Sequence, residues 1–166
     1  PARVAAGDTV HVMLNASDNG NVASVTANEV ALSNTGGNVW EGNITADSGL
    51  GSHTVTVVAK DEASLDSTDT SASYRTDRIV CAGNLSVRNA SIVGASSSYL
   101  FRMLGRVTLV DGDSFTLDDG SGQVVSVTAP GHSIEVGDYA TARGILNPNL
   151  SPPTLTGSAA HAVKLD

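Results

Sequence analysis

The sequence is poor in cysteine and lysine and has no long apolar run. Its single cysteine, Cys81, excludes an internal disulfide. Because Cys81 follows two apolar residues, we expect a small buried side chain rather than a reactive thiol. Small secreted domains of eukaryotes are usually rich in disulfides, so their absence favours a prokaryotic protein. No stretch of about 18 apolar residues occurs, and the sequence therefore predicts no insertion into a membrane.

Long helices are also disfavoured, because Gly, Ser, Thr, Asn and Val dominate the sequence. This composition is typical of short β-strands joined by turns. A chain of 166 residues is long enough for two small domains, each with its own core. We expect an all-β protein with one domain over residues 1–76 and a second over residues 77–166. The chain begins at Pro1 and reaches strand-like sequence by Thr9, so we expect a piece of a longer protein.

The negative charge is shared unevenly between the two expected domains. The formal net charge is −8. Residues 1–76 hold three basic and nine acidic side chains, which gives −6, and residues 77–166 hold six and eight, which gives −2. An acidic surface repels polyphosphates and acidic lipids, so the charge argues against nucleic acid as a partner.

The first domain shows the period-two alternation of half-buried strands. Val10, Val12 and Leu14, for example, alternate with His11 and Met13. Short strands at such regular spacing predict a β-sandwich. The expected strands cover residues 9–16, 22–27, 30–33, 39–45, 54–60 and 70–76.

Several segments of this domain follow a shared pattern of strands and turns. They include Gly7-Asp8-Thr9-Val10, Ser52-His53-Thr54-Val55-Thr56-Val57 and Val58-Ala59-Lys60-Asp61-Glu62-Ala63. With these segments, residues 5–76 resemble the Ig-like repeats of bacterial and archaeal surface proteins. The resemblance implies an immunoglobulin-like sandwich that acts as a spacer, stalk or adhesion platform beside neighbouring domains of a longer surface protein.

The same resemblance raises the question of calcium, because some of these repeats bind Ca²⁺ between loops at one end of the sandwich. Asp18 and Asp61 follow the first and the penultimate strand, so they are the candidate ligands, with Glu62 and Asp66 as further oxygen donors. Ca²⁺ takes six to eight oxygen ligands, and this set is small. The alternative, which we favour, is that these are solvated carboxylates of turns.

The second domain has its clearest pattern from residue 99 onward. Phe101, Met103, Gly105, Val107 and Leu109 are expected on one inward face of a long strand, and a glycine in mid-strand is typical of a sharply coiled barrel. The expected strands cover 85–87, 90–93, 99–109, 115–117, 124–128, 139–146, 154–156 and 161–165.

Four motifs follow one another in this domain: Gly105-Arg106-Val107, Phe115-Thr116-Leu117-Asp118-Asp119-Gly120-Ser121-Gly122, Val136-Gly137-Asp138-Tyr139 and Arg143-Gly144. Their order resembles OB-fold domains of the nucleic-acid-binding superfamily. The resemblance covers residues 99–166 and implies a five-stranded OB-type barrel with a binding face for an oligosaccharide or single-stranded nucleic acid. Arg102, Arg106 and Arg143 are expected to point outward with Tyr139. Neighbouring carboxylates reduce the field of these arginines.

The sequence carries no recognisable catalytic set. The four histidines share no common setting, and nucleophile elbows, phosphate-binding loops and zinc motifs are missing. The adjacent acids Asp118 and Asp119 lie in a glycine-rich turn, which favours turn formation over glycoside chemistry. We therefore expect a non-enzymatic module pair without a cofactor, extracellular or on the cell surface, that acts as a spacer or assembly unit. The alternative is a barrel that binds an oligosaccharide or a single strand through Arg102, Arg106, Tyr139 and Arg143.

Overall fold

The computed structural model describes residues 2–165, apart from the side chains of residues 88, 90 and 91. The fold is all-β with a few short helical segments, which confirms the predicted fold class. The chain divides into two compact units, residues 1–77 and 78–166. No helix within the described residues has the length and apolarity needed to cross a membrane.

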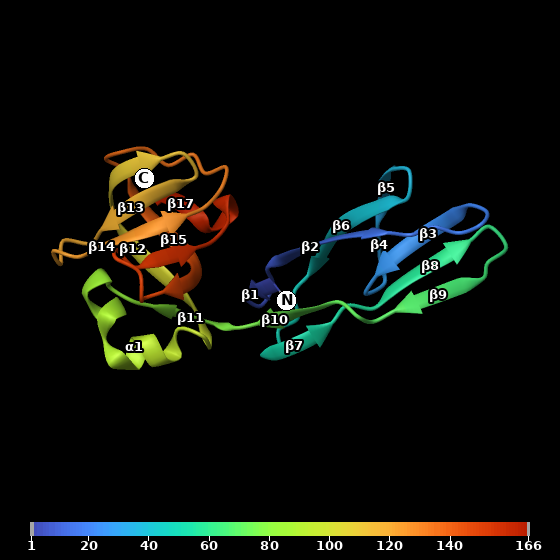
Figure 1. The fold of residues 1–166 in the computed structure, drawn as a ribbon, viewed down its shortest axis with the longest axis horizontal. Helices are drawn as coiled ribbons and strands as arrows, with labels where there is room; N and C mark the ends of the chain where they lie inside the picture. Colours follow the sequence, from blue (N-terminus) through green and yellow to red (C-terminus); the bar gives the residue numbers. More distant parts are fainter. Residues whose placement is uncertain (1, 166) are drawn as a thin grey trace. The chain divides into compact units, whose positions relative to one another are not determined.

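Three small sheets form the first unit (Figure 1). Their strands, in spatial order, are β2 (Thr9–Asn15), β6 (Val39–Thr45) and β5 (Ser33–Gly36); β4 (Val30–Ala31), β3 (Val22–Ala27), β8 (Val57–Asp61) and β9 (Asp66–Asp69); and β1 (Ala2–Val4), β10 (Ser73–Thr76) and β7 (Gly51–Thr54).

The core of this unit lies between the first two sheets. Val10, Trp40 and Ile44 from one sheet form a single buried cluster with Val25 and Ala27 from the other. The alternation seen in the sequence therefore directs these side chains to a shared interior, as the period of a strand requires.

The strand expected over residues 54–60 is interrupted. β7 ends at Thr54 and β8 begins at Val57, because the two halves pair with different sheets. Asn28 holds the break: its side-chain oxygen accepts from the Thr56 amide at 2.8 Å, and its own amide donates to the Thr56 carbonyl at 2.8 Å. The local alternation of apolar residues does not predict that a strand changes from one sheet to another.

Asp77 closes the first unit with a buried ionic cluster. Its carboxylate accepts from Arg3 Nε at 2.5 Å and from Arg75 Nε at 2.7 Å, and only 2% of its side chain is exposed. Its amide also donates to the Val4 carbonyl at 2.9 Å. These bonds tie β1 and β10 together and place Asp77 with the first unit.

The second unit contains a closed five-stranded barrel (Figure 1). β14 and β16 run parallel, whereas the other neighbouring pairs of the barrel are antiparallel. Two further strands, β11 (Arg78–Cys81) and β17 (Ala162–Leu165), add to β12 and β15. In order around the barrel the strands are β12 (Tyr99–Asp111), β13 (Ser114–Asp118), β14 (Val124–Thr128), β16 (Thr154–Thr156) and β15 (Tyr139–Asn147).

The predicted inward row of the long strand is confirmed except at its end. Phe101, Met103 and Val107 are buried in the barrel core with Phe115. Leu109 was expected on the same row, but it is 58% exposed. The register between β12 and β13 shifts between Val107 and Leu109, so a β-bulge reverses the side-chain alternation at that point.

The strands expected at 85–87 and 90–93 are wrong. The chain forms a 3₁₀ helix, η1 (Asn84–Arg88), and a short α-helix, α1 (Ala90–Ala95), and a second 3₁₀ turn, η2 (Ala159–His161), precedes β17. The buried side-chain amide of Asn84 donates to the carbonyls of Leu117 (2.9 Å) and Gln123 (3.0 Å). The helical start is therefore fixed by partners more than thirty residues away, which local sequence does not reveal.

The prediction of a buried Cys81 is also wrong, because the thiol is exposed. β11 pairs in parallel with β12 so that Cys81 lies beside Arg102, whose side chain points outward. Neighbouring residues of paired strands point to the same side of a sheet, so the register places Cys81 on the outer surface.

Candidate binding surfaces

The four residues proposed for binding lie together on the outer face of the barrel. Arg102 is the ladder partner of Arg143, and Arg106 is the partner of Tyr139, across β12 and β15. Both pairs point away from the core, with Leu104 and Thr141 as the pair between them. The structure thus brings together side chains that are far apart in the sequence, 41 residues for Arg102 and Arg143 and 33 residues for Arg106 and Tyr139.

Tyr139 is the exposed aromatic residue of this surface, with 60% of the residue accessible. It borders a depression with a volume of about 390 Å³ on the outside of the barrel. Arg106 and Leu104 line the depression from β12, and Asp118 and Asp119 line it from the end of β13. We call this hollow the barrel depression.

Gly105 also lines the depression, at a close approach of β12 to β13. A Cβ at this position would lie 2.7 Å from the carbonyl oxygen of Asp118, closer than real Cβ contacts come. The two strands therefore approach each other at a residue without a side chain, and the side chains of Arg106 and Asp118, which are ladder partners, stand beside this contact.

Two carboxylates give the barrel depression a mixed charge. Burial by itself raises the pKa of Asp119, but hydrogen bonds from the Ser121 side chain and from backbone amides, that of Asn84 included, outweigh it and lower the pKa below its ordinary value. Asp118 accepts a hydrogen bond from the amide of Gly120 at 2.8 Å. Both side chains were interpreted from sequence as turn formers, and their place beside Arg106 and Tyr139 was missed.

Arg143 has a partner that the sequence did not suggest. Its guanidinium donates to Nε2 of His161, and Nδ1 of the same ring lies 3.2 Å from the hydroxyl of Ser158. This chain of contacts ties the β15 face to η2, which leaves Arg106 and Tyr139 as the more exposed pair.

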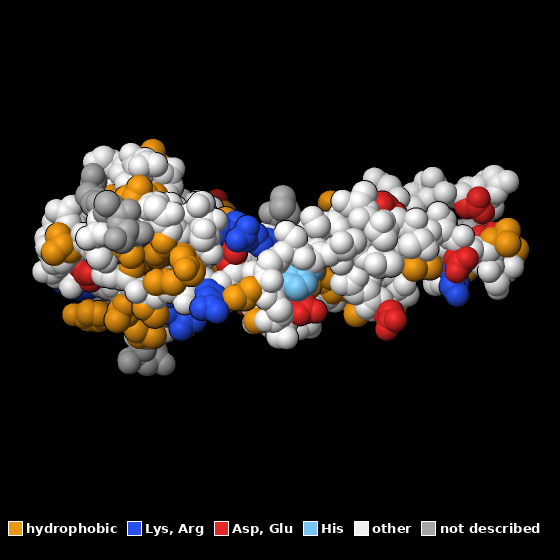
Figure 2. Space-filling model, turned by 90° about the horizontal axis from the view of Figure 1, so that it is seen from below, with side chains coloured by type: hydrophobic (Ala, Val, Ile, Leu, Met, Phe, Trp, Pro, Cys, Tyr) orange, Lys and Arg blue, Asp and Glu red, His pale blue; other side chains and the backbone are white. Residues whose placement is uncertain are grey.

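On the face drawn in Figure 2, Lys and Arg side chains of the barrel unit lie beside apolar ones, while carboxylates are spread along the first unit.

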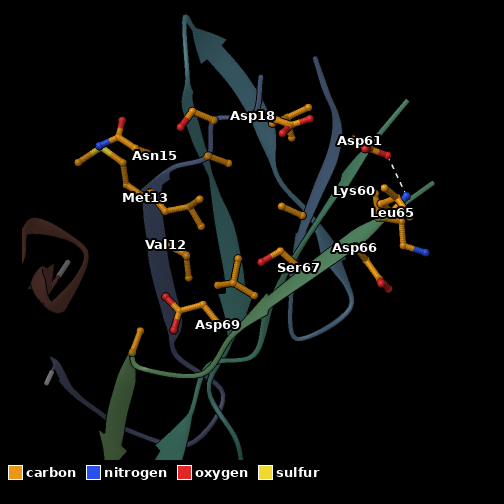
Figure 3. Close-up of a pocket in the computed structure, with 17 residues that line it drawn as sticks. Val12, Met13, Asn15, Asp18, Lys60, Asp61, Leu65, Asp66, Ser67 and Asp69 are labelled. Carbon is orange, nitrogen blue, oxygen red and sulfur yellow. Dashed lines mark hydrogen bonds between the residues drawn. The ribbon is translucent and has the colours of Figure 1, made fainter. Parts of the chain in front are cut away.

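The two proposed calcium ligands line a second hollow, in the first unit. Asp18 and Asp61 border a groove of about 540 Å³ between β2 and β9 (Figure 3). Asp61 Oδ1 accepts from the Leu65 amide at 2.8 Å, as a turn-forming carboxylate does. Among residues 2–165 no group of three or more His, Cys, Asp or Glu side chains is placed to hold a metal ion.

Calcium at Asp18 and Asp61 stays a prediction, and it is tested by titration calorimetry with Ca²⁺ on the full chain. If the two carboxylates hold the ion, binding heat and a rise in melting temperature are expected, because a ligand of the folded state stabilises it. The Asp18→Asn variant should then lose both effects. Titration without heat or a melting shift removes the calcium hypothesis.

Neither hollow is explained by a known relative. No protein-family model and no curated protein matches the chain. The assignment of function therefore depends on the geometry and chemistry of these two surfaces.

Proposed function

We propose that the chain is a non-catalytic pair of β modules of a longer surface protein, in which the barrel binds an oligosaccharide and the Ig-like sandwich acts as a spacer. The observation that carries this proposal is the barrel depression, where the exposed ring of Tyr139 lies next to Arg106 and two carboxylates. An exposed aromatic beside the outward arginines favours a binding role over a purely structural one.

The side chains of the depression match the chemistry of a sugar. An aromatic ring packs against the apolar face of a pyranose, while carboxylate and guanidinium groups form hydrogen bonds to its hydroxyls. The volume of about 390 Å³ falls in the range of roughly 300–1,000 Å³ typical of small-ligand sites. The barrel depression therefore fits one sugar ring, with the rest of the oligosaccharide extending over the β12–β15 face.

The same residues argue against a single-stranded nucleic acid. Asp118 and Asp119 line the depression on the side opposite Tyr139 in the ladder order, and they would repel phosphates. An electrostatic groove for nucleic acid needs positive charge along its length, and here Arg106 lies between Tyr139 and the carboxylate of Asp118.

The strand order of the barrel supports an OB-type assignment. β12, β13, β14, β16 and β15 follow one another around the barrel, with a parallel pair between β14 and β16. Barrels of this type bind oligosaccharides as well as oligonucleotides. The face-to-face sheets of the first unit support the Ig-like assignment in the same way.

The test is a glycan array, followed by calorimetric titration with the best ligand. The Tyr139→Ala variant is expected to weaken binding by roughly fivefold to a hundredfold, because loss of an aromatic stacking partner costs about 1–3 kcal/mol. Arg106→Ala should weaken binding to a similar degree through its lost hydrogen bonds. Neutral glycans should bind at moderate salt, since the interaction does not depend on phosphate.

Two exposed residues outside the depression serve as controls. Val136→Ala removes a side chain that is 64% exposed, and Arg78→Ala removes an exposed arginine of β11. Both variants should bind like the unaltered chain. Binding of oligonucleotides instead of glycans, or glycan binding that survives Tyr139→Ala, would contradict the proposal, and the absence of any ligand would favour a spacer role for both units.

A further inference from the structure

The groove of the first unit lies between two strands that end their sheets. β2 is the last strand of one sheet and β9 is the last strand of the other. The lining includes the consecutive residues 12–18, from β2 and the segment that follows it, so that the edge of β2, and not one face, borders the groove. In Figure 3 Val12 and Met13 of β2 stand on one side of the hollow and Asp66 of β9 on the other, while Asp69 lies below Val12.

The unpaired edge of β2 carries main-chain groups without a partner. The amide of Ala46 donates to the Asp8 carbonyl, and the amide of Ala16 donates to the Asn38 carbonyl. These two bonds show which residues of β2 form the hydrogen-bonded pairs of the antiparallel ladder. Even-numbered residues such as Val12 therefore bond to β6, whereas the amides and carbonyls of His11 and Met13 point away from it. Within the described residues these outward groups of His11 and Met13 make no hydrogen bond.

The floor of the groove is an uncovered part of the core. Val12, Leu14 and Ala16 of the β2 segment pack against the buried cluster but remain only half-buried. Val57 and Ala59 of β8 do the same from the other sheet. A strand laid in the groove would cover these side chains with its own inward row.

Two apolar side chains at the borders of the groove are unusually exposed. Met13 is 67% exposed and Leu65 is 71% exposed, the largest fractions among the large apolar side chains of the described residues. Both residues line the groove, one from β2 and one from the turn before β9. A chain segment between them would shield both side chains from water.

The charges around the groove select the kind of segment. Four carboxylates line it against one lysine, Lys60. A second copy of this chain would bring the same acidic edges and would be repelled. A strand with basic side chains on its outward row would instead meet opposite charge. The carboxylates are Asp18, Asp61, Asp66 and Asp69.

We propose that this groove binds an extended, basic peptide segment of a partner protein, which adds to the free edge of β2 as a further strand. Strand addition of this kind draws affinity from main-chain hydrogen bonds and specificity from alternate side chains. The inward side chains of the segment are small and apolar, and they cover Val12 and Leu14. Its lysine or arginine side chains meet the carboxylates that line the groove, Asp66 on the outer side of β9 among them.

A titration with a labelled peptide tests the proposal on the full chain. The probe is the synthetic peptide Lys-Val-Thr-Val-Lys-Val-Thr-Val-Lys, followed by fluorescence anisotropy in the presence of EDTA so that divalent cations do not compete. Saturable binding is expected, together with protection of the amides of residues 11–15 from hydrogen exchange. The matching peptide with glutamate in place of lysine should bind at least about tenfold more weakly.

A proline at Met13 separates strand addition from other modes of binding. The Met13 amide is not needed for pairing with β6, and proline is tolerated where the amide faces away from the ladder. Met13→Pro should therefore fold and yet bind the peptide roughly tenfold more weakly, whereas Met13→Ala keeps the amide and loses less. The unchanged melting temperature of the proline variant is the check on its fold.

Removal of two carboxylates from β9 tests whether charge selects the peptide. Asp66→Asn combined with Asp69→Asn should weaken the lysine peptide roughly fivefold and should not weaken the glutamate peptide. Equal affinity of Met13→Pro and Met13→Ala, or equal affinity of the two peptides, would overturn the proposal. Self-association of the unaltered chain through the β2 edge, seen by sedimentation, would assign the groove to a second copy instead.

Discussion

The Gly144→Ala variant is expected to lose at least about 3 kcal/mol of unfolding free energy in the barrel unit, at the upper end of what overpacking costs. A Cβ at Gly144 would lie 2.1 Å from the carbonyl oxygen of Thr156 and 2.5 Å from its carbonyl carbon. Neither atom is on a flexible side chain, so the backbone itself must shift. The barrel closes at this point, because β15 leaves the side of β12 and pairs with β16.

Gly157, which follows β16, makes a similarly close approach to the backbone of β15. A Cβ at Gly157 would meet the carbonyl oxygen of Arg143 at 2.4 Å. Two glycines therefore face each other's backbone where β15 passes the end of β16. The added methyl group of Gly144→Ala separates these segments and opens the barrel core around Phe101, the ladder partner of Gly144.

Calorimetry and fluorescence together measure the effect in the correct unit. Trp40 is the only tryptophan, and it is buried in the first unit, so its fluorescence reports that unit alone. Gly144→Ala should lower the calorimetric transition of the barrel by more than about 10 °C and leave the Trp40 transition in place. Gly94→Ala is the matched control: apart from its chain neighbours and the backbone of its own helix, no atom lies within 4 Å of a Cβ there, and alanine in a helix should stabilise by up to about 1 kcal/mol. Equal stability of Gly144→Ala and Gly94→Ala would mean that the crossing is not as tight as described.

The Asp77→Ala variant is expected to cost the first unit about 3 kcal/mol, because removal of one member of a buried ion pair leaves its partners without compensation. Asp77 receives hydrogen bonds from Arg3 and Arg75 and is almost fully buried. Arg75 is 45% exposed in its side chain and regains water when the carboxylate is lost, so the cost falls at the lower end of the range for such clusters. Only 17% of the Arg3 side chain is exposed. Most of the lost free energy therefore comes from leaving the Arg3 guanidinium buried without its carboxylate.

The Trp40 fluorescence transition is the measurement for Asp77→Ala, and the barrel transition should not move. An exposed pair of the same unit supplies the control. His11 and Glu41 lie 3.4 Å apart with 56% and 38% of their side chains exposed. Glu41→Gln should change stability by less than about 1 kcal/mol, as surface pairs do. If Asp77→Ala is as mild as Glu41→Gln, the cluster does not hold β1 to β10.

Several features of the fold were predictable because they depend on short-range alternation. The rows of Val10, Val12 and Leu14 on β2 and of Phe101, Met103 and Val107 on β12 follow from the period of a strand. Outward directions of Arg102, Arg106 and Tyr139 follow from the same rule. The sequence alone thus determined the all-β class and the residues of the outer barrel face.

Other features were decided only by tertiary structure. The bulge that exposes Leu109, the parallel register that exposes Cys81 and the helical start at Asn84 each depend on a partner strand or carbonyl distant in the chain. Asp77 was expected to begin the second domain, but it belongs to the first unit, where its carboxylate accepts a hydrogen bond from Arg3 near the start of the chain.

The same distinction between local and long-range features applies to the two candidate surfaces. Which side chains point outward is a local property, because alternation along one strand fixes it. Which of them meet is a property of pairing, because ladder register and sheet order place Asp118 beside Arg106 and leave the edge of β2 open. Pairing depends on contacts between residues far apart in sequence, and for this reason the alternation was readable from the sequence while the depression and the groove were not.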